Sequence, residues 1–215
     1  MHTTISAPDP QRTSQRSMRR RRSRVERAMA RLASWRILVV SALLLTLFAA
    51  VFFASSAPFA IPTVEETCGA APLDVRFYST SNQVNDFLAD CGEEGRDAYR
   101  NMQIADFFYP SVFGLFLASA LTLTLTRLFP QRPDAVALAA IALAGSALDY
   151  LENVFAWIAL TSYPNPTLSN SLLGFASAAK TMVFWAAGAG LVVGVAALAL
   201  RAVRHRAAGP TRQLG

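Results

Sequence analysis

The sequence predicts an all-α, polytopic membrane protein in which four transmembrane helices form an antiparallel bundle with one disulfide-closed outer loop. Of the 215 residues, 53% are hydrophobic, and most of them fall in four long apolar runs. A helix that crosses a bilayer needs about 20 apolar residues at about 1.5 Å of rise each, and each run is long enough. Arginines cluster at the ends of these runs, and both cysteines lie in one polar segment between the first two.

Residues 1–36 are predicted to be a disordered, basic cytoplasmic tail that ends in a juxtamembrane segment. Ten of the 19 arginines lie here, directly before the first apolar run. From Arg24 to Arg36, apolar side chains recur on one side of a helix, as in helices at a membrane surface. We therefore expect the Arg19–Arg36 segment to bind anionic lipid head groups. The net charge of +6 would suggest nucleic acid in a soluble chain, but this placement favours lipid and predicts no nucleic-acid partner.

The first span is predicted at residues 37–57. Small residues at 54–60 leave a cleaved signal peptide as the alternative, although the apolar run is longer than a usual signal sequence, which favours a retained anchor. The other predicted spans and the second basic cytoplasmic tail are residues 104–128, 135–160, 168–200 and 201–215.

Residues 58–103 form the predicted outer loop, which carries eight acids and three arginines. Residues 72–79 alternate weakly, like a short strand, and Ser81–Cys91 has helical spacing with Gly92 as a stop. Because basic segments stay in the cytoplasm, we expect both termini there and this loop outside a bacterial plasma membrane. An exported loop permits a disulfide. A Cys68–Cys91 bond that closes about 24 residues would stabilise the fold by about 3 kcal/mol.

The third span carries Asp149, Glu152 and Asn153 within its apolar run, and helical spacing puts them on the same face as several small residues. An aspartate at the centre of a membrane costs about 2.5–3.5 kcal/mol. The fourth span carries Lys180, the one lysine of the sequence, at a similar depth. We therefore expect Lys180 to pair with Asp149 and to share the pair with Glu152. Two acids and one lysine leave one negative charge, which a proton, a cation or an uncharged hydrogen-bond donor would compensate.

Asp106 and Tyr109 lie near the outer start of the second span and are predicted to line the mouth of a cavity that leads to the deeper groups. The candidate ligand-binding residues are Asp106, Tyr109, Asp149, Glu152, Asn153 and Lys180. The histidines, His2 and His205, lie in the polar tails. This argues against a Ser-His-Asp triad, His-ligated iron or haem, and His-Glu zinc motifs, so we predict no metal and no cofactor. Gly190 and Gly194 are expected to serve helix packing.

These polar residues resemble the pattern of a family of small four-helix bacterial integral membrane proteins without an assigned activity. The matching residues are Gly95-Arg96 with Tyr99, Asp106 with Tyr109-Pro110, Asp149 with Glu152-Asn153, and Lys180. The resemblance covers about residues 70–190 and implies that these residues belong together. A looser likeness is to the EXPERA-type four-helix fold of sterol isomerases and sterol-binding proteins, which also uses buried carboxylates. The intramembrane lysine and the long Cys-bearing loop depart from that pattern, so the comparison is an analogy.

The sequence favours binding of a small polar or amphiphilic ligand in a bundle cavity lined by Asp149, Glu152 and Lys180. One alternative is a lipid-modifying enzyme in which one carboxyl acts as acid and its neighbour as base. Another is a structural subunit whose ion pair only fixes helix packing. A transporter is disfavoured by four spans, no inverted repeat and no broken helix pair. The expected partners are the lipid bilayer, a small-molecule or lipid ligand, and a second copy of the chain.

Overall fold

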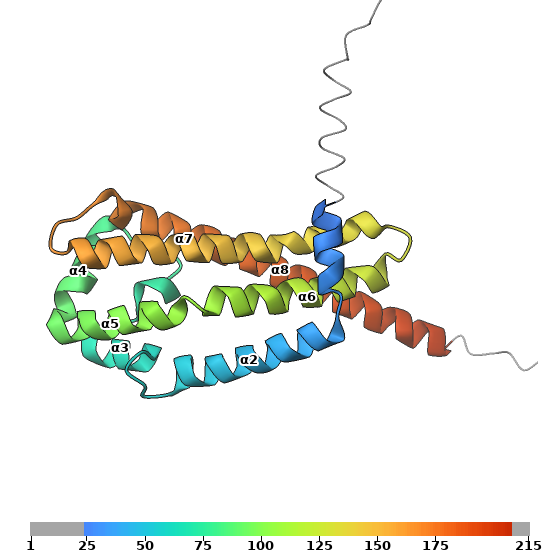
Figure 1. Cartoon of the computed structure of the whole chain (residues 1–215), viewed down its shortest axis with the longest axis horizontal. Coiled ribbons are helices and arrows are strands. Elements are labelled where there is room, and N and C mark those ends of the chain that lie inside the picture. The colour runs from blue at the N-terminus through green and yellow to red at the C-terminus, as the bar shows by residue number, and fades with distance from the viewer. Residues whose placement is uncertain (1–23, 208–215) are drawn as a thin grey trace, which may run out of the picture.

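A computed structural model describes residues 24–207, and all regular secondary structure in this range is helical (Figure 1). Residues 24–32 form the first helix. The elements that follow are α2 (Trp35–Ala54), α3 (Ile61–Cys68), η1 (Leu73–Val75), α4 (Ser81–Asp90), α5 (Gly92–Asp106), α6 (Tyr109–Leu128), η2 (Pro133–Ala139), α7 (Ala140–Ser162) and α8 (Leu168–Ala207). The outer parts of the two predicted tails, residues 1–23 and 208–215, lie outside the described residues.

Four helical stretches are long and apolar enough to cross a membrane, which agrees with the four predicted spans. They are Trp35–Ala54, Gly92–Leu128, Pro133–Ser162 and Leu168–Arg206. Two of them, Gly92–Leu128 and Leu168–Arg206, extend well beyond the apolar runs of the sequence. The reason is that apolar content decides what fits into lipid, whereas backbone hydrogen bonding and helix breakers decide where a helix ends.

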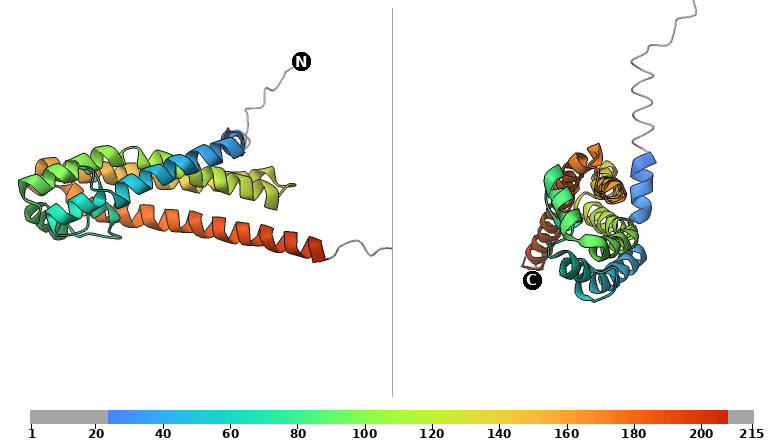
Figure 2. Two further views of the ribbon diagram at one scale, coloured as in Figure 1. Left: turned by 90° about the horizontal axis from the view of Figure 1, so that it is seen from below. Right: turned by 90° about the vertical axis from the view of Figure 1, so that its left-hand side faces the viewer.

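Helix α6 lies at the centre and contacts α2, α7 and α8, and α7 also packs along α8. Helices α3, α4 and the start of α5 gather at one end of the molecule (Figure 1). Residues 24–32 and the C-terminal end of α8 lie at the opposite end, where α8 runs on beyond the other helices (Figures 1 and 2). The two ends of the described chain are therefore on the same side of the spanning helices.

The second span is interrupted next to Asp106, where α5 ends and before α6 begins at Tyr109. Pro110 causes the break, since it has no N–H to donate to the carbonyl of Asp106 four residues earlier. The carbonyl of Pro110 in turn accepts a hydrogen bond from Ser146 Oγ of α7 at 2.7 Å. The apolar run predicts one continuous helix here, so the irregular backbone beside Asp106 was not expected.

The short strand expected at residues 72–79 is wrong, because η1 forms there and no strand occurs within residues 24–207. The segment that follows η1 lies against α8. A Cβ atom on Gly174 would lie 2.2 Å from the backbone oxygen of Ser79, and the ring of Phe77 stacks on Trp185 at 5.9 Å. A strand needs a neighbouring strand to satisfy its backbone, whereas the neighbours of this segment are helices.

The outer loop is a helical cap over the ends of α7 and α8. Val64, Leu88 and Tyr99 of the cap share one buried cluster with Leu160 of α7 and Leu173 of α8. The predicted helix after residue 80 is present as α4, and Gly92 ends it with a left-handed φ of 61°, which glycine adopts without a steric penalty. The ends of α7 and α8 that meet at residues 162–168 therefore pack against protein.

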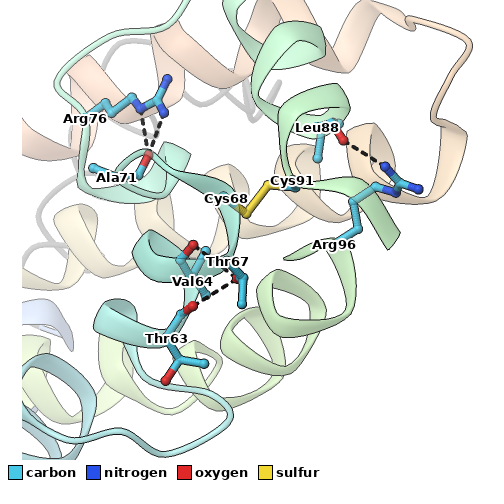
Figure 3. Close-up of a disulfide and its surroundings, with 9 residues drawn as sticks. All are labelled: Thr63, Val64, Thr67, Cys68, Ala71, Arg76, Leu88, Cys91 and Arg96. Atoms are coloured by element: carbon cyan, nitrogen blue, oxygen red, sulfur yellow. Dashed lines mark hydrogen bonds between the residues drawn. A yellow bond between two sulfur atoms is a disulfide. The ribbon is translucent and has the colours of Figure 1, made fainter. Parts of the chain in front are cut away.

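The predicted disulfide between Cys68 and Cys91 is present and ties the end of α3 to the junction of α4 and α5 (Figure 3). Arg96, which follows this junction, donates a hydrogen bond from Nη1 to the carbonyl of Leu88 at 2.9 Å. Its guanidinium group also lies 4.7 Å from the ring centroid of Tyr163, in the turn between α7 and α8. These contacts join the cap to the outer ends of two spanning helices.

The helix at residues 24–32 packs against the middle of α6. Its Met29 side chain is buried, and Ser119 Oγ of α6 donates a hydrogen bond to the carbonyl of Leu32 at 2.9 Å. Arg24 and Arg31 are exposed, so their side chains are accessible to anionic lipid. The contact with lipid itself stays a prediction.

The two glycines of the predicted packing motif have different surroundings. A Cβ atom on Gly194 would lie 2.6 Å from Thr124 Cγ2 of α6, whereas one on Gly190 would have no neighbour within 4 Å. The packing role is thus confirmed for Gly194, and Gly190 faces open space.

Candidate functional site

The polar face predicted for α7 is buried, as expected. Its buried residues are Ala142, Gly145, Ser146, Asp149, Glu152, Asn153, Ala156, Ala159 and Leu160. Small side chains let the neighbouring helices approach closely. At Gly145, for example, a Cβ atom would lie 2.6 Å from the ring of Phe184 in α8. The acids of α7 therefore point into the helical interior.

Lys180 of α8 contacts both acids of α7, as predicted. Its Nζ atom donates to Asp149 Oδ1 at 2.9 Å and forms a second ion pair with Glu152. Glu152 also accepts a hydrogen bond from Ser177 Oγ. The side chains of Asp149 and Glu152 are 3% and 0% exposed, so Lys180 neutralises charge that neither water nor lipid can reach.

Two further carboxylates lie buried nearby. Asp106 accepts a hydrogen bond from Asn153 Nδ2 at 2.9 Å. Asp74 of η1 accepts hydrogen bonds from Gln103 Nε2 at 2.6 Å and from the Tyr99 hydroxyl at 3.3 Å. We call Asp74, Asp106, Asp149, Glu152 and Lys180 the carboxylate cluster.

Sequence reasoning missed Asp74 because it lies in a loop, where an acid is ordinary. Only the burial of η1 between helices makes it unusual, and that burial depends on contacts distant in the sequence. Its apolar neighbours Leu73 and Val75 were the one local signal. Gln103, which holds Asp74, was also missed, since it lies at the edge of the predicted loop.

Asp74 is the one member of the carboxylate cluster that lies outside the four spans, and it should make stability pH-dependent. Burial disfavours the charged carboxylate and raises the pKa of Asp74 from 3.8 to about 6, although Lys180 opposes this shift. The folded protein then holds this proton more tightly than the unfolded chain. Stability should therefore be highest near pH 4 and fall by at most about 3 kcal/mol as the pH rises to about 6.

Unfolding in detergent across this pH range tests the expectation, with Asp74→Asn as the variant. The variant should lose that part of the pH dependence, whereas Asp90→Asn at an exposed site should keep it. An unchanged slope in Asp74→Asn would show that other groups cause the pH dependence.

Two adjoining grooves open beside the break in the second span. One has a volume of about 230 Å³ and the other about 280 Å³, and they share Gln103, Phe107 and Trp157. The remaining lining residues are Tyr150, Asn153, Val154 and Ile158 in the first groove and Ile104 and Phe108 in the second. The wall residues are largely exposed apolar side chains of candidate spanning helices, such as Val154 at 52%. We refer to both together as the lateral groove.

The lateral groove has a polar floor. Gln103 and Asn153 are only 4% and 7% exposed, and both line the groove. Their side-chain oxygens, Gln103 Oε1 and Asn153 Oδ1, are buried and have no hydrogen-bond partner. A buried acceptor without a partner costs about 1–3 kcal/mol, so these two atoms are suited to accept hydrogen bonds from a ligand.

The predicted site residues do not all meet in one cavity. Of the six, only Asn153 lines the lateral groove. Asp106 does not line it but accepts a hydrogen bond from Asn153. The ring of Tyr109 stacks on Phe113 at 5.5 Å and packs against Phe48 of α2 at 5.6 Å, so its surroundings are aromatic.

No family model matches the sequence, and neither the curated proteins nor the solved structures contain a significant match to it. The resemblance to a family of small four-helix bacterial membrane proteins therefore stays a prediction. Function has to be argued from the site itself.

Proposed function

We propose that this chain is a multi-pass membrane protein that binds an amphiphilic ligand in the lateral groove. The observation that carries the proposal is the combination of exposed apolar walls with two buried, unpartnered amide oxygens at the floor. A ligand site of this kind is typically concave and mostly apolar, with a few polar groups that fix orientation. The apolar part of an amphiphile would lie against the apolar walls of the groove, and its head would reach Gln103 and Asn153.

We further propose that the four spans form an antiparallel bundle in a bacterial plasma membrane, with both termini cytoplasmic. The spans carry arginines close to one end, and the two ends of the described chain lie together there (Figure 1). Basic residues near span ends favour the cytoplasmic side. The acidic, disulfide-bonded cap would then lie outside.

This orientation gives the lateral groove a depth in the bilayer. An apolar layer of about 30 Å corresponds to about 20 helical residues. Counted from the arginines at the proposed cytoplasmic ends, 20 residues lead from Arg127 through α6 to Phe107, from Arg132 through η2 to Glu152 of α7, and from Arg201 to Thr181 within α8. Each end point is a member of the carboxylate cluster or the sequence neighbour of a member. Three helices thus give one level for the outer boundary of the apolar layer.

The lateral groove would straddle that boundary. Gln103 and Trp157 lie on the outer side of the level, where head groups are found, and Tyr150 lies on the inner side. Tryptophan is enriched at such boundaries because its ring is amphipathic. A site at this depth supports a ligand with one polar and one apolar part.

The geometry favours binding over acid–base catalysis. Asp149 and Glu152 both contact Lys180, and neither lines the lateral groove. A general acid or base must come within hydrogen-bond reach of the reacting group. The ion pairs are better suited to hold α7 against α8, so that the wall of the groove stays in place.

The proposal can be tested with a protein that retains Trp157 as its one tryptophan, through Trp35→Phe and Trp185→Phe. A brominated alkyl glycerol in phosphatidylcholine nanodiscs should quench Trp157 saturably, since bromine quenches at contact. Val154→Phe, which fills the groove, should weaken binding by about tenfold, or about 1.4 kcal/mol.

Leu151→Phe is the matched control, because Leu151 is exposed on the same helix and does not line the groove. It should leave the binding midpoint unchanged. Quenching that rises linearly with probe, or that ignores Val154→Phe, would indicate general lipid contact and overturn the proposal.

A further inference from the structure

The two amides at the groove floor have their orientation fixed from behind. Gln103 Nε2 donates to Asp74 Oδ2 at 2.6 Å, and Asn153 Nδ2 donates to Asp106 Oδ2 at 2.9 Å. A carboxylate accepts hydrogen bonds, so the NH₂ side of each amide must face it. Rotating either amide by 180° would place two oxygens against each other next to buried negative charge. Both amides are therefore held with their oxygens free.

The groove floor consequently offers two free acceptors. Gln103 Oε1 and Asn153 Oδ1 each lack a partner. The other polar groups of the lining are the indole N–H of Trp157 in the wall and the Tyr150 hydroxyl, which is already bonded to Ser111 Oγ at 2.6 Å. A ligand head with hydroxyl or ammonium hydrogens can satisfy both oxygens. A head that has only acceptors would leave them unpaired.

Two carboxyl groups lie behind the floor, and the charge there is negative once they are ionised. Asp74 and Asp106, the two residues that orient the amides, form no ion pair within residues 24–207, whereas Lys180 is engaged by Asp149 and Glu152. The three arginines of the cap bind elsewhere, with Arg76 on the carbonyl of Ala71, Arg96 on that of Leu88 and Arg100 on the carboxylate of Asp97. Burial strengthens the field of these carboxylates, because the surroundings screen it poorly.

From these two observations we infer that the lateral groove selects amphiphiles whose head group donates hydrogen bonds and carries no net negative charge. The inference rests on the proposed function and names its ligand class. Asp74 and Asp106 are positioning residues in this account, since they act through Gln103 and Asn153 without touching the ligand.

Competition against the brominated alkyl glycerol on the Trp157-only protein tests the selection. The competitors are dodecyl glycerol, dodecylamine and dodecyl phosphate, which share one alkyl chain and differ in the head. Dodecyl glycerol and dodecylamine should displace the probe. Dodecyl phosphate should bind at least about tenfold more weakly, because like charges placed together oppose binding.

Asp106→Asn should bring the ratio of the dissociation constants of dodecyl phosphate and dodecyl glycerol closer to one. An amide in place of the carboxylate removes charge, and it also lets Asn153 rotate its NH₂ group into the groove. Asp90→Asn makes the same chemical change at an exposed position of α4 and should leave the ratio unchanged. This readout is a preference between ligands, so a merely structural role of Asp106 would not move it.

The outcomes separate the two claims. If dodecyl phosphate displaces the probe as well as the other two, the selection is overturned while the binding site stands. If no competitor displaces the probe and Val154→Phe has no effect, the proposed function itself fails. The comparison of three competitors on the parent protein decides the inference even where Asp106→Asn does not fold.

Discussion

Lys180→Met is expected to lower the free energy of unfolding by about 3–5 kcal/mol, the usual cost of removing one partner from a buried ion pair. Lys180 balances two carboxylates whose side chains are 3% and 0% exposed. Methionine fills a similar volume, so the change removes the charge and leaves the packing largely intact. Unfolding by SDS titration in mixed micelles measures the loss.

Arg100→Met provides a control with the same chemistry at the surface. Arg100 pairs with Asp97, and both side chains are far more exposed, at 43% and 60%. An exposed pair contributes about 0–1 kcal/mol. The contrast between the two substitutions isolates burial as the cause of the larger effect.

A double-mutant cycle then separates helix packing from a retained functional charge. If the pair mainly holds α7 to α8, Asp149→Asn should also destabilise, and Lys180→Met with Asp149→Asn should lose less than the sum of the two. Glu152 keeps its charge in the double variant, so recovery should be partial. If Asp149→Asn does not lower the free energy of unfolding, Asp149 is retained at a cost to the stability of the fold. If Lys180→Met lowers the free energy of unfolding by less than about 1 kcal/mol, a structural role for the pair is contradicted.

The carboxylate cluster shows which parts of a site local sequence can predict. The buried face of α7 follows from helical periodicity, which needs only the spacing of residues along one helix. The partner Lys180 follows from charge balance, since the sequence has one lysine and it lies within a span. The Cys68–Cys91 bond follows because the chain has two cysteines, and both lie in the loop between the first two spans.

Asp74 and the lateral groove were not predictable in this way. The groove forms where Pro110 breaks the second span and Gln103 is brought beside Asn153, so its parts come from separate helices.

Gly174→Ala is expected to destabilise the protein by about 4 kcal/mol. The added Cβ would lie 2.2 Å from the oxygen and 2.9 Å from the nitrogen of Ser79. These are backbone atoms, which cannot rotate away as a side chain would, so the segment after η1 must shift. Overpacking of this kind costs about 1–3 kcal/mol, and displacing Asp74 from Gln103 and Tyr99 leaves buried polar groups unpaired at about 1–3 kcal/mol more.

Gly188→Ala on the same helix is the matched control. A Cβ atom there would have no neighbour within 4 Å, and alanine is favoured over glycine in a helix by about 1 kcal/mol. Gly188→Ala should therefore be neutral or stabilising in the same SDS titration. Equal effects of the two substitutions would contradict the close contact between α8 and the η1 segment.

Gly174→Ala also tests whether the position of Asp74 in the cap affects ligand preference in the lateral groove. When Asp74 moves away, Gln103 loses the carboxylate that fixes its amide, and its NH₂ group becomes free to turn toward the ligand. Any folded Gly174→Ala protein should then discriminate less strongly against dodecyl phosphate, although no residue of the groove has been replaced. A variant that is destabilised but keeps the full preference would place the origin of selection at Asp106 and Asn153 alone.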